Sequence, residues 1–477
     1  MHYFGIDFGT TNTAGIMLQE GHVSLLGDDA GRPLPSIVSI EKGTGRLEAG
    51  RQVWDTQEER IQSGQEILVP SIKTHLGKGR TWQVGAAEIT AEDIAAQIFQ
   101  EISRQAARRN APPLRRAAVT IPIGFPASAR AELRGAAAKA GIEISTFVHE
   151  PTAALIRFYP KVKYHSNVAV FDWGGGTLDI SVMHLERSRV EEVATTGLPK
   201  AGDLIDDKMA RAIHEHEMSR RGSSLAFEEV RTRDRDLLRT RCEVAKCEMA
   251  TRESTEILVY EYAGKTLGFV VTKSWFDALV APFVEEAIEQ LAHTIGEAKI
   301  STDELGALII IGGTSKLSLL QERLLNDDRF FAALEGSNTP DWDVAHGAAM
   351  VDHIPGCYEI AEAVGLVLSD GEFYQLVRSG DRVQAQHRTV SLALVEDVPE
   401  ANIVLAKLRQ GAAERERQTV LRFSVPSAGF DGERIALSYC ISPDLVLNVR
   451  AKSETRDDRY EVEREYEELR FAYRVAE

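Results

Sequence analysis

Hydrophobic residues recur with two spacings along roughly the first 350 residues, and these spacings predict strands interleaved with helices. Continuous aliphatic runs at 117–121 and 308–311 predict buried strands. An alanine-rich stretch at 127–140, together with the segments 203–250 and 275–299, shows the spacing of helices that bury one face and carry charge pairs on the other. This alternation predicts a layered α/β core in which ligand-binding loops lie at strand ends.

The pattern changes after about residue 356, where short segments of alternating hydrophobic and polar residues follow one another. Such alternation predicts antiparallel strands that bury one face. The charged segment 460–466 predicts a final edge strand, because charges discourage an edge from pairing with another chain. We therefore predict an α/β domain over 1–355 and a smaller antiparallel β-domain over 356–477. The strands predicted in the second domain include 373–377, 390–394, 403–408 and 445–449.

Two segments, 3–13 and 170–180, share one pattern: an apolar strand, an aspartate at its end, a turn rich in glycine and threonine, and a second strand. Glycine lets backbone N–H groups approach a phosphate closely, and hydroxyl groups add further donors. The aspartates, Asp7 and Asp172, suit a magnesium ion held through water. One such turn in each half of a duplicated core predicts a site that grips the triphosphate of ATP from both sides.

Composition narrows the set of partners. The chain has 477 residues, 43% of them hydrophobic and 27% charged, so two or more globular domains are expected. A formal net charge of −17 argues against nucleic acid and anionic membranes as main partners. The four cysteines form no CxxC pair, and neither a signal peptide nor a membrane-spanning run is visible. We therefore expect a cytoplasmic protein.

The order of the motifs adds a resemblance. The chain resembles the seventy-kilodalton heat-shock chaperones (DnaK-type), within the actin and sugar-kinase ATPase superfamily. The resemblance covers nearly the whole chain, and it implies an actin-like ATPase domain followed by a β-sandwich substrate domain. In this short chain, the helical lid that normally follows the β-sandwich is not expected. The motifs that carry the resemblance are 7–13, 70–74, 149–154, 172–179, 241–248 and 310–317.

The resemblance implies roles for individual residues. Lys73 matches the family's catalytic lysine, which places a point charge on the γ-phosphate and orients the attacking water. Glu150, at the start of a helix, would help hold the water shell of a magnesium ion, with Asp7 and Asp172 also binding the metal through water. Thr177 and Asp179 would position water or the γ-phosphate. The implied catalytic residues are Lys73, Glu150, Asp172, Thr177 and Asp179.

The implied cofactors are ATP or ADP with Mg²⁺. Glu243 and Lys246 lie three apart on one helical face, so both are expected to reach the ribose hydroxyls. Where the family has an arginine that stacks on adenine, this chain has Lys316, which has no planar group to stack. The implied nucleotide-binding residues are Asp7, Gly9, Thr10, Thr11, Asn12, Gly174, Gly175, Gly176, Thr177, Gly202, Asp203, Glu243, Lys246, Gly312, Gly313, Thr314, Ser315, Lys316 and Asp341.

The segments that couple nucleotide to substrate match the family less closely. Pro122 and Arg130 match its proline switch and relay arginine, but the family's tyrosine is Gly124 here. The linker at 354–361 lacks the run of leucines that the family has there. The segment 408–411, by contrast, matches a segment of the family's β-sandwich. The partners implied are an extended hydrophobic peptide or protein client, a J-domain co-chaperone and a nucleotide exchange factor.

Three interpretations of the function follow. The first is an ATP-dependent chaperone that hydrolyses Mg-ATP slowly and couples hydrolysis to peptide binding. The second is a nucleotide-gated scaffold or regulator with negligible turnover, which the unusual linker and Lys316 favour. The third is a small-molecule kinase, which would need a sugar-specificity insert and an aspartate base in place of the lysine, and for which the β-domain would have no purpose. Outside these motifs, His214 and His216 lie two apart on a predicted helix and are expected on its solvated face.

Overall fold

The structure is a computed structural model of the chain, and it divides into two compact units. The first unit comprises Met1–Ile144, Val148–Met183 and Ala194–His353. The second comprises Ser145–Phe147, His184–Val193 and Ile354–Glu477. The residues described are 2–20, 22–330, 333–335, 339–354, 358–383, 386–408, 417–430, 432–455 and 461–475. The predicted division at 355/356 falls outside them, so the domain boundary stays a prediction.

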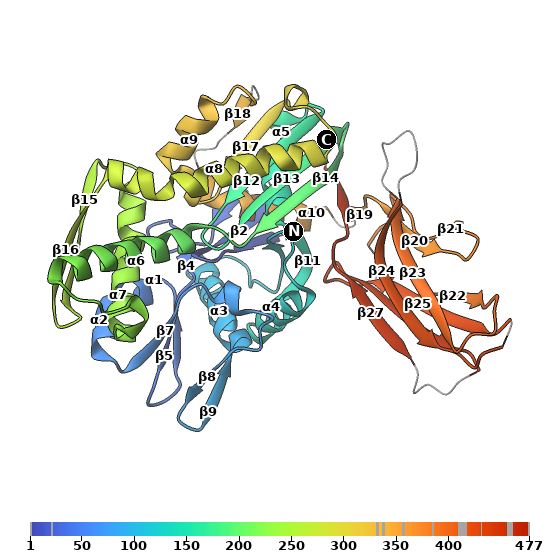
Figure 1. The fold of residues 1–477 in the computed structure, drawn as a ribbon, viewed down its shortest axis with the longest axis horizontal. Helices are drawn as coiled ribbons and strands as arrows, with labels where there is room; N and C mark the ends of the chain where they lie inside the picture. The colour runs from blue at the N-terminus through green and yellow to red at the C-terminus, as the bar shows by residue number, and fades with distance from the viewer. Residues whose placement is uncertain are drawn as a thin grey trace. The chain divides into compact units, whose positions relative to one another are not determined.

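One sheet is built around the first glycine hairpin (Figure 1). Its strand order is β11-β10-β1-β2-β3, with β4 paired to β2. Strand β1 runs parallel to β10 and antiparallel to β2. The aliphatic run 117–121, predicted as a buried strand, forms β10 and is buried. Helix α3 covers one face of β1, where Phe8 stacks on Phe99 at 5.0 Å between ring centroids. The strands are β1 (Tyr3–Phe8), β2 (Asn12–Gln19), β3 (His22–Leu25), β4 (Leu34–Pro35), β10 (Arg116–Ile121) and β11 (Glu143–His149), and α3 spans Ala91–Arg108.

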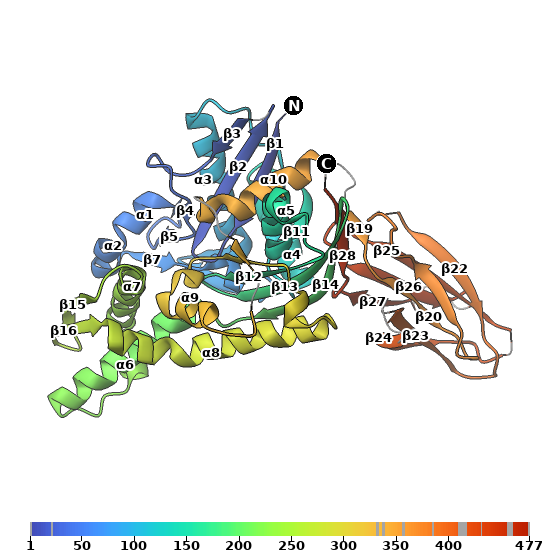
Figure 2. The same ribbon diagram turned by 90° about the horizontal axis from the view of Figure 1, so that it is seen from above.

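A second sheet is built around the second glycine hairpin. Its strand order is β18-β17-β12-β13-β14-β28-β19, and β12 pairs with β17 in parallel. Figure 2 shows β12 and β13 between helix α5 on one side and helix α8 on the other. The strands are β12 (Asn167–Trp173), β13 (Leu178–Glu186), β14 (Arg189–Leu198), β17 (Ala307–Ile311), β18 (Ala333–Glu335), β19 (Tyr358–Ile360) and β28 (Phe471–Arg474), and the helices are α5 (Glu150–Val162) and α8 (Lys273–Glu297).

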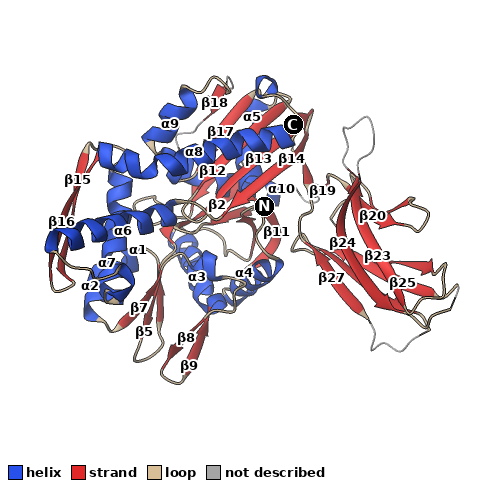
Figure 3. Cartoon of the chain, viewed as in Figure 1, coloured by secondary structure: helices blue, strands red, loops and turns tan. Residues whose placement is uncertain are grey.

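The other helices of the first unit confirm the periodic pattern. The predicted helix at 127–140 is α4 (Ala127–Lys139), and 203–250 folds as α6 (Gly202–Arg221) and α7 (Thr232–Glu248). The last helix of the described residues is α10 (Asp343–His353), and every later element is a strand, as the colours of Figure 3 show. No helix in the described ranges has both the length and the apolar character needed to cross a membrane.

Shorter elements complete the first unit. They are the three-stranded sheet of β5 (Val38–Glu41), β6 (Leu47–Ala49) and β7 (Glu66–Val69), the hairpins β8 (Thr81–Val84) with β9 (Ala87–Thr90) and β15 (Ser254–Tyr262) with β16 (Lys265–Thr272), and the helices α1 (Arg51–Asp55), α2 (Gln57–Ser63) and α9 (Ser318–Leu325).

One prediction in this unit is wrong. His216 is exposed, as expected, but His214 is buried, with 2% of its surface accessible. The Nδ1 of His214 lies 2.9 Å from the hydroxyl of Tyr262, and its Nε2 lies 2.9 Å from the carbonyl oxygen of Leu225. The β15–β16 hairpin covers this face of α6, and nothing in the local sequence of the helix shows that it does so.

The second unit holds two four-stranded antiparallel sheets. The hydroxyl of Tyr439 in one sheet donates to the carbonyl oxygen of Leu376 in the other, at 2.9 Å. All four of the predicted strands form, and the charged segment forms β27, one of the two edge strands of its sheet. The first sheet has the order β21 (Phe373–Val377), β20 (Ala363–Val367), β23 (Glu400–Leu408) and β24 (Arg417–Pro426), and the second has β22 (Arg388–Ala393), β25 (Arg434–Ile441), β26 (Leu447–Ser453) and β27 (Val462–Tyr466).

The pairing of β28 could not be predicted from the sequence. This strand pairs antiparallel with Arg189–Glu191 of β14 on one side and with β19 on the other. The predicted linker at 354–361 therefore supplies one strand of this arrangement, although 355–357 lie outside the described residues. Most of the predicted match at 408–411 also lies outside them.

Candidate functional site

A pocket of about 590 Å³ lies between the two glycine hairpins of the first unit. Residues far apart in the sequence line it, from both sheets and from α7 and α10. The predicted site residues that line the pocket are Asp7, Gly9, Thr10, Thr11, Asn12, Lys73, Glu150, Asp172, Gly174, Gly175, Gly176, Thr177, Glu243, Lys246, Gly312, Gly313, Thr314, Lys316 and Asp341. Four other predicted residues, Asp179, Gly202, Asp203 and Ser315, are absent from the lining.

The glycines of the second hairpin allow its turn to approach the first. A Cβ atom added to Gly175 would lie 2.0 Å from Oγ1 of Thr11, and one added to Gly176 would lie 2.5 Å from Oγ1 of Thr10. Side chains at these positions would therefore push the two turns apart. The turns meet closely enough that the backbone amides of one and the hydroxyl groups of the other border the same space.

A buried ion pair lies at the end of the pocket where phosphate is predicted to bind. Lys73 and Glu150 are 5% and 8% exposed, and the ammonium of Lys73 donates to Oε1 of Glu150. Burial by itself would lower the pKa of Lys73, but Glu150 and Asp7 more than offset this effect and raise it. The lysine therefore stays protonated.

Two further carboxylates share this end of the pocket. Burial and the charge of Glu150 raise the pKa of Asp7 to about 6, against the lowering effects of Lys73 and of a 2.7 Å hydrogen bond from Thr120. Burial and the charge of Glu150 also raise the pKa of Asp172 well above its usual value. Carboxylates crowded in this way gain stability from a cation between them.

These carboxylates fit a magnesium ion. Mg²⁺ keeps several waters and is usually held by one or two carboxylates together with the phosphates of its substrate. Asp7 and Asp172 are the next-to-last residues of the two strands that enter the glycine turns, and both carboxylates border the same pocket. Within the described ranges, no three His, Cys, Asp or Glu side chains lie close enough together to hold a metal by themselves. This donor set matches a metal that arrives with a nucleotide.

Asp179 lies behind the pocket rather than in it. The residue is fully buried, and its Oδ1 accepts a 2.7 Å hydrogen bond from the backbone N–H of Ile123. Burial and the charge of Glu150 raise its pKa to about 8, and a hydrogen bond with Thr177 acts in the opposite direction. Of these neighbours, Thr177 and Glu150 line the pocket. Ile123 follows Pro122, the predicted switch proline, so this bond joins that segment to the second hairpin.

The opposite end of the pocket carries the residues predicted to meet the nucleoside. Lys246 Nζ lies 2.5 Å from Oδ2 of Asp206 and 3.2 Å from the carbonyl oxygen of Gly202. Burial, aided by the charge of Asp206, raises the pKa of Glu243 to about 7. Lys316 pairs with Asp341 at 2.8 Å across the mouth.

The predicted residues outside the lining support it from behind. The backbone N–H of Gly202 donates to the carbonyl oxygen of Gly174 at 3.2 Å, and that of Asp203 donates to the carbonyl oxygen of Gly175 at 2.8 Å. The start of α6 is thus tied to the second glycine turn. Ser315 is 2% exposed, and its hydroxyl has no hydrogen-bond partner among the described residues.

Some residues that line the pocket were not predicted from the sequence. Arg32 and Arg51 line the pocket, and the Nε of each lies 2.9 Å from Oδ2 of the buried Asp28. Neither arginine belongs to a recognisable motif. Cys247 and Thr251 also line the pocket, and the position of Cys247 four residues after Glu243 on the α7 face was a usable signal, whereas Thr251 lies beyond the end of the helix.

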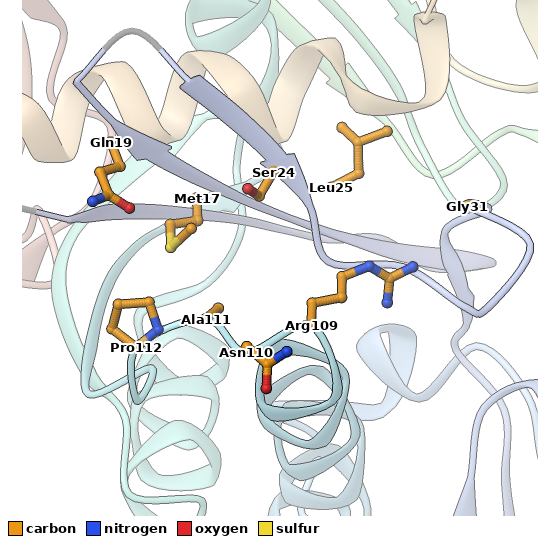
Figure 4. Close-up of a pocket in the computed structure, with 9 residues that line it drawn as sticks. All are labelled: Met17, Gln19, Ser24, Leu25, Gly31, Arg109, Asn110, Ala111 and Pro112. Atoms are coloured by element: carbon orange, nitrogen blue, oxygen red, sulfur yellow. The ribbon is translucent and has the colours of Figure 1, made fainter.

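A second cavity, of about 420 Å³, lies beside β2, β3 and the end of α3 (Figure 4). Arg109 is already engaged there, donating 3.0 and 2.7 Å hydrogen bonds to the carbonyl oxygens of Gly27 and Asp28. No predicted site residue lines this cavity. Its lining consists of Met17, Gln19, Ser24, Leu25, Gly31, Arg109, Asn110, Ala111 and Pro112.

Comparison with known families gives one match. The family model described as Hsp70 protein matches residues 3–370. The match includes both glycine hairpins, the Lys73–Glu150 pair and every residue that lines the larger pocket. It extends beyond α10 into the first strands of the second unit.

Proposed function

Since the chain belongs to the Hsp70 family, a family of ATP-binding molecular chaperones, we propose that it binds Mg-ATP between its two glycine hairpins, hydrolyses it slowly to ADP and phosphate, and couples hydrolysis to the binding of extended polypeptides. The observation that carries the proposal is the buried pairing of Lys73 with Glu150 beside Asp7 and Asp172. A plain binding site for an anion has no need of three carboxylates at its phosphate end.

We assign each residue a role from its position in the pocket. The backbone amides and hydroxyl groups of the two turns bind the phosphates, and the ammonium of Lys73 interacts with the terminal phosphate. A bound magnesium ion would neutralise charge on the phosphates, with Asp7 and Asp172 holding its waters. Glu150 accepts a hydrogen bond from Lys73 and so keeps the ammonium directed at this end of the pocket. Thr177, backed by Asp179, orients the water.

The nucleoside is held at the other end. Glu243, Lys246, Gly312, Gly313, Thr314, Lys316 and Asp341 all line that part of the pocket or its mouth. The ammonium of Lys246 already donates a hydrogen bond to Asp206, so only its remaining N–H donors can bind a ribose. Lys316 has no plane to stack on a base, and we expect base affinity to be modest.

The second unit is proposed to bind the client. Three of its large apolar side chains are exposed: Tyr374 on β21, and Val395 and Phe430 in the loops after β22 and β24, at 46%, 65% and 46% of their surface. Exposed apolar side chains on a strand and its neighbouring loops suit an extended hydrophobic segment. We propose a J-domain co-chaperone and a nucleotide exchange factor as further partners, because the family generally works with both. We also propose a cytoplasmic location, because Cys242, Cys247 and Cys440, the cysteines in the described ranges, are free thiols.

Single-turnover hydrolysis of Mg-ATP tests the proposal. Replacing Lys73 with alanine should slow hydrolysis by roughly a hundredfold or more, because a preorganised charge at the reacting phosphate is lost. Lys78→Ala is the matched control, since Lys78 is an exposed lysine five residues further along. Extended hydrophobic peptides should raise the wild-type rate. Tight nucleotide binding without any hydrolysis that depends on Lys73 would reject the ATPase and leave a nucleotide-gated scaffold.

A further inference from the structure

The turn that carries Lys73 is tied to the opposite side of the pocket by one side-chain hydrogen bond. The hydroxyl of Ser71 donates to Oδ2 of Asp203 at 2.7 Å, between residues 132 positions apart. Ser71 belongs to the half of the unit built on the first sheet, whereas Asp203 is in the first turn of α6, beside the second glycine hairpin.

Ser71 holds an unusual backbone conformation. Its φ of 54° and ψ of 39° lie in the left-handed region, which non-glycine residues rarely adopt and which costs free energy. The residue directly precedes the short 3-10 helix Ile72–His75, which contains Lys73. Both the N–H and the hydroxyl of Thr74 donate to the carbonyl oxygen of Ser71 at 2.9 Å. The conformation of Ser71 therefore sets the direction in which Lys73 leaves the backbone.

Asp203 is held just as firmly on its own side. Its backbone N–H donates to the carbonyl oxygen of Gly175 at 2.8 Å. A Cβ atom added to Gly175 would lie 3.4 Å from Oδ1 of Asp203 and 2.0 Å from Oγ1 of Thr11, so both glycine turns and this carboxylate meet at one point. Displacing Asp203 would displace the turn that borders the phosphate end.

We propose that Ser71 and Asp203 are positioning residues that hold the Lys73 turn in register with the second glycine turn when the pocket is closed. Neither side chain lines the pocket, so neither needs to touch the nucleotide. Their bond joins the two halves of the unit, and the ammonium of Lys73 reaches the terminal phosphate only when both halves are in place. The inference rests on the proposed ATPase activity.

The test separates the hydroxyl from the backbone strain. Ser71→Ala keeps the strain and removes the donor, Ser71→Gly removes both, and Ser71→Asn tolerates the left-handed region and restores a donor. With Mg-ATP prebound, we expect the alanine and glycine variants to hydrolyse about ten- to a hundredfold more slowly, while nucleotide affinity changes by less than about threefold. The asparagine variant should recover most of the rate.

A double-mutant cycle with Asp203→Ala completes the test. The rate loss in the double variant should equal that of either single variant, because both remove the same bond. Additive losses would overturn the proposal, as would a Ser71→Ala rate within twofold of wild type. If the wild type itself does not hydrolyse ATP, the proposed function fails separately, and release of a fluorescent ADP analogue decides the inference. Unchanged release in Ser71→Ala then rejects it, and faster release supports it.

Discussion

The crossing of α5 and α10 depends on a glycine whose replacement has a predictable cost. A Cβ atom added to Gly347 in α10 would lie 1.7 Å from the carbonyl oxygen of Ala153 in α5 and 2.4 Å from its carbonyl carbon. Both atoms belong to backbone, which cannot rotate away as a side chain can. We therefore expect Gly347→Ala to force the two helices apart.

Two terms of opposite sign set the magnitude. Alanine is favoured over glycine within a helix by about 1 kcal/mol. Overpacking a tight core costs typically about 1–3 kcal/mol, and a collision with backbone belongs at the upper end or beyond. We expect Gly347→Ala to lower the free energy of unfolding by about 1–3 kcal/mol after the helical gain is included.

Gly296→Ala is the matched control. Gly296 lies in α8, is exposed, and has no atom within 4 Å of an added Cβ. The same substitution should there raise stability by about 0.4–1 kcal/mol, because only the helical gain and the stiffer unfolded chain remain. The free energies of unfolding of the two variants should therefore differ by about 1.4–4 kcal/mol.

Urea unfolding followed by tryptophan fluorescence is the assay. All five tryptophans lie in the first unit, so the signal reports that unit alone. The same variant should weaken nucleotide binding, because α5 begins at Glu150 and α10 follows Asp341, and both residues line the pocket. A Gly347→Ala protein as stable as wild type would refute this account of how the helices pack.

Two other predictions concern buried charges. The pKa of Asp179 is raised from 3.8 to about 8, so between these values the folded protein holds a proton that the unfolded chain has lost. The stability of the nucleotide-free protein in EDTA should therefore fall as pH rises from about 4 to 8. Asp179→Asn should make stability depend less on pH in this range and should raise Tm at pH 8 by several degrees. An unaltered pH dependence would contradict the raised pKa of Asp179. In the second unit Lys407 pairs with Glu362 at 3.4 Å, and both are at most 6% exposed. Lys407→Met should lower the free energy of unfolding of that unit by about 3–5 kcal/mol in a chemical denaturation experiment, since the buried carboxylate loses its partner. Adding Glu362→Leu should recover most of this loss. A double variant as unstable as Lys407→Met would argue against an isolated pair.

Much of the fold was predictable because its signals are local. Aliphatic runs gave β10 and β17, and the helical spacing gave α4, α6, α7 and α8, since periodicity records which face of an element is buried. The two glycine turns were predictable for a similar reason, because their residues are chosen for backbone geometry and for the groups they offer to phosphate.

Other features required the tertiary structure, because they join residues whose separation in sequence carries no signal. Lys73 meets Glu150 across 77 positions, and Ser71 meets Asp203 across 132. His214 is buried because a distant hairpin covers it, although its own helix gives no indication of this.

By itself, the sequence determined the order of the elements, the two phosphate turns and the residue types beside them. The tertiary structure decided which of those residues share one pocket, which stand behind it and which strands pair at the end of the chain. Periodicity specifies a buried face but not what buries it. That choice is made when the sheets and helices pack, as when β28 pairs with both β14 and β19.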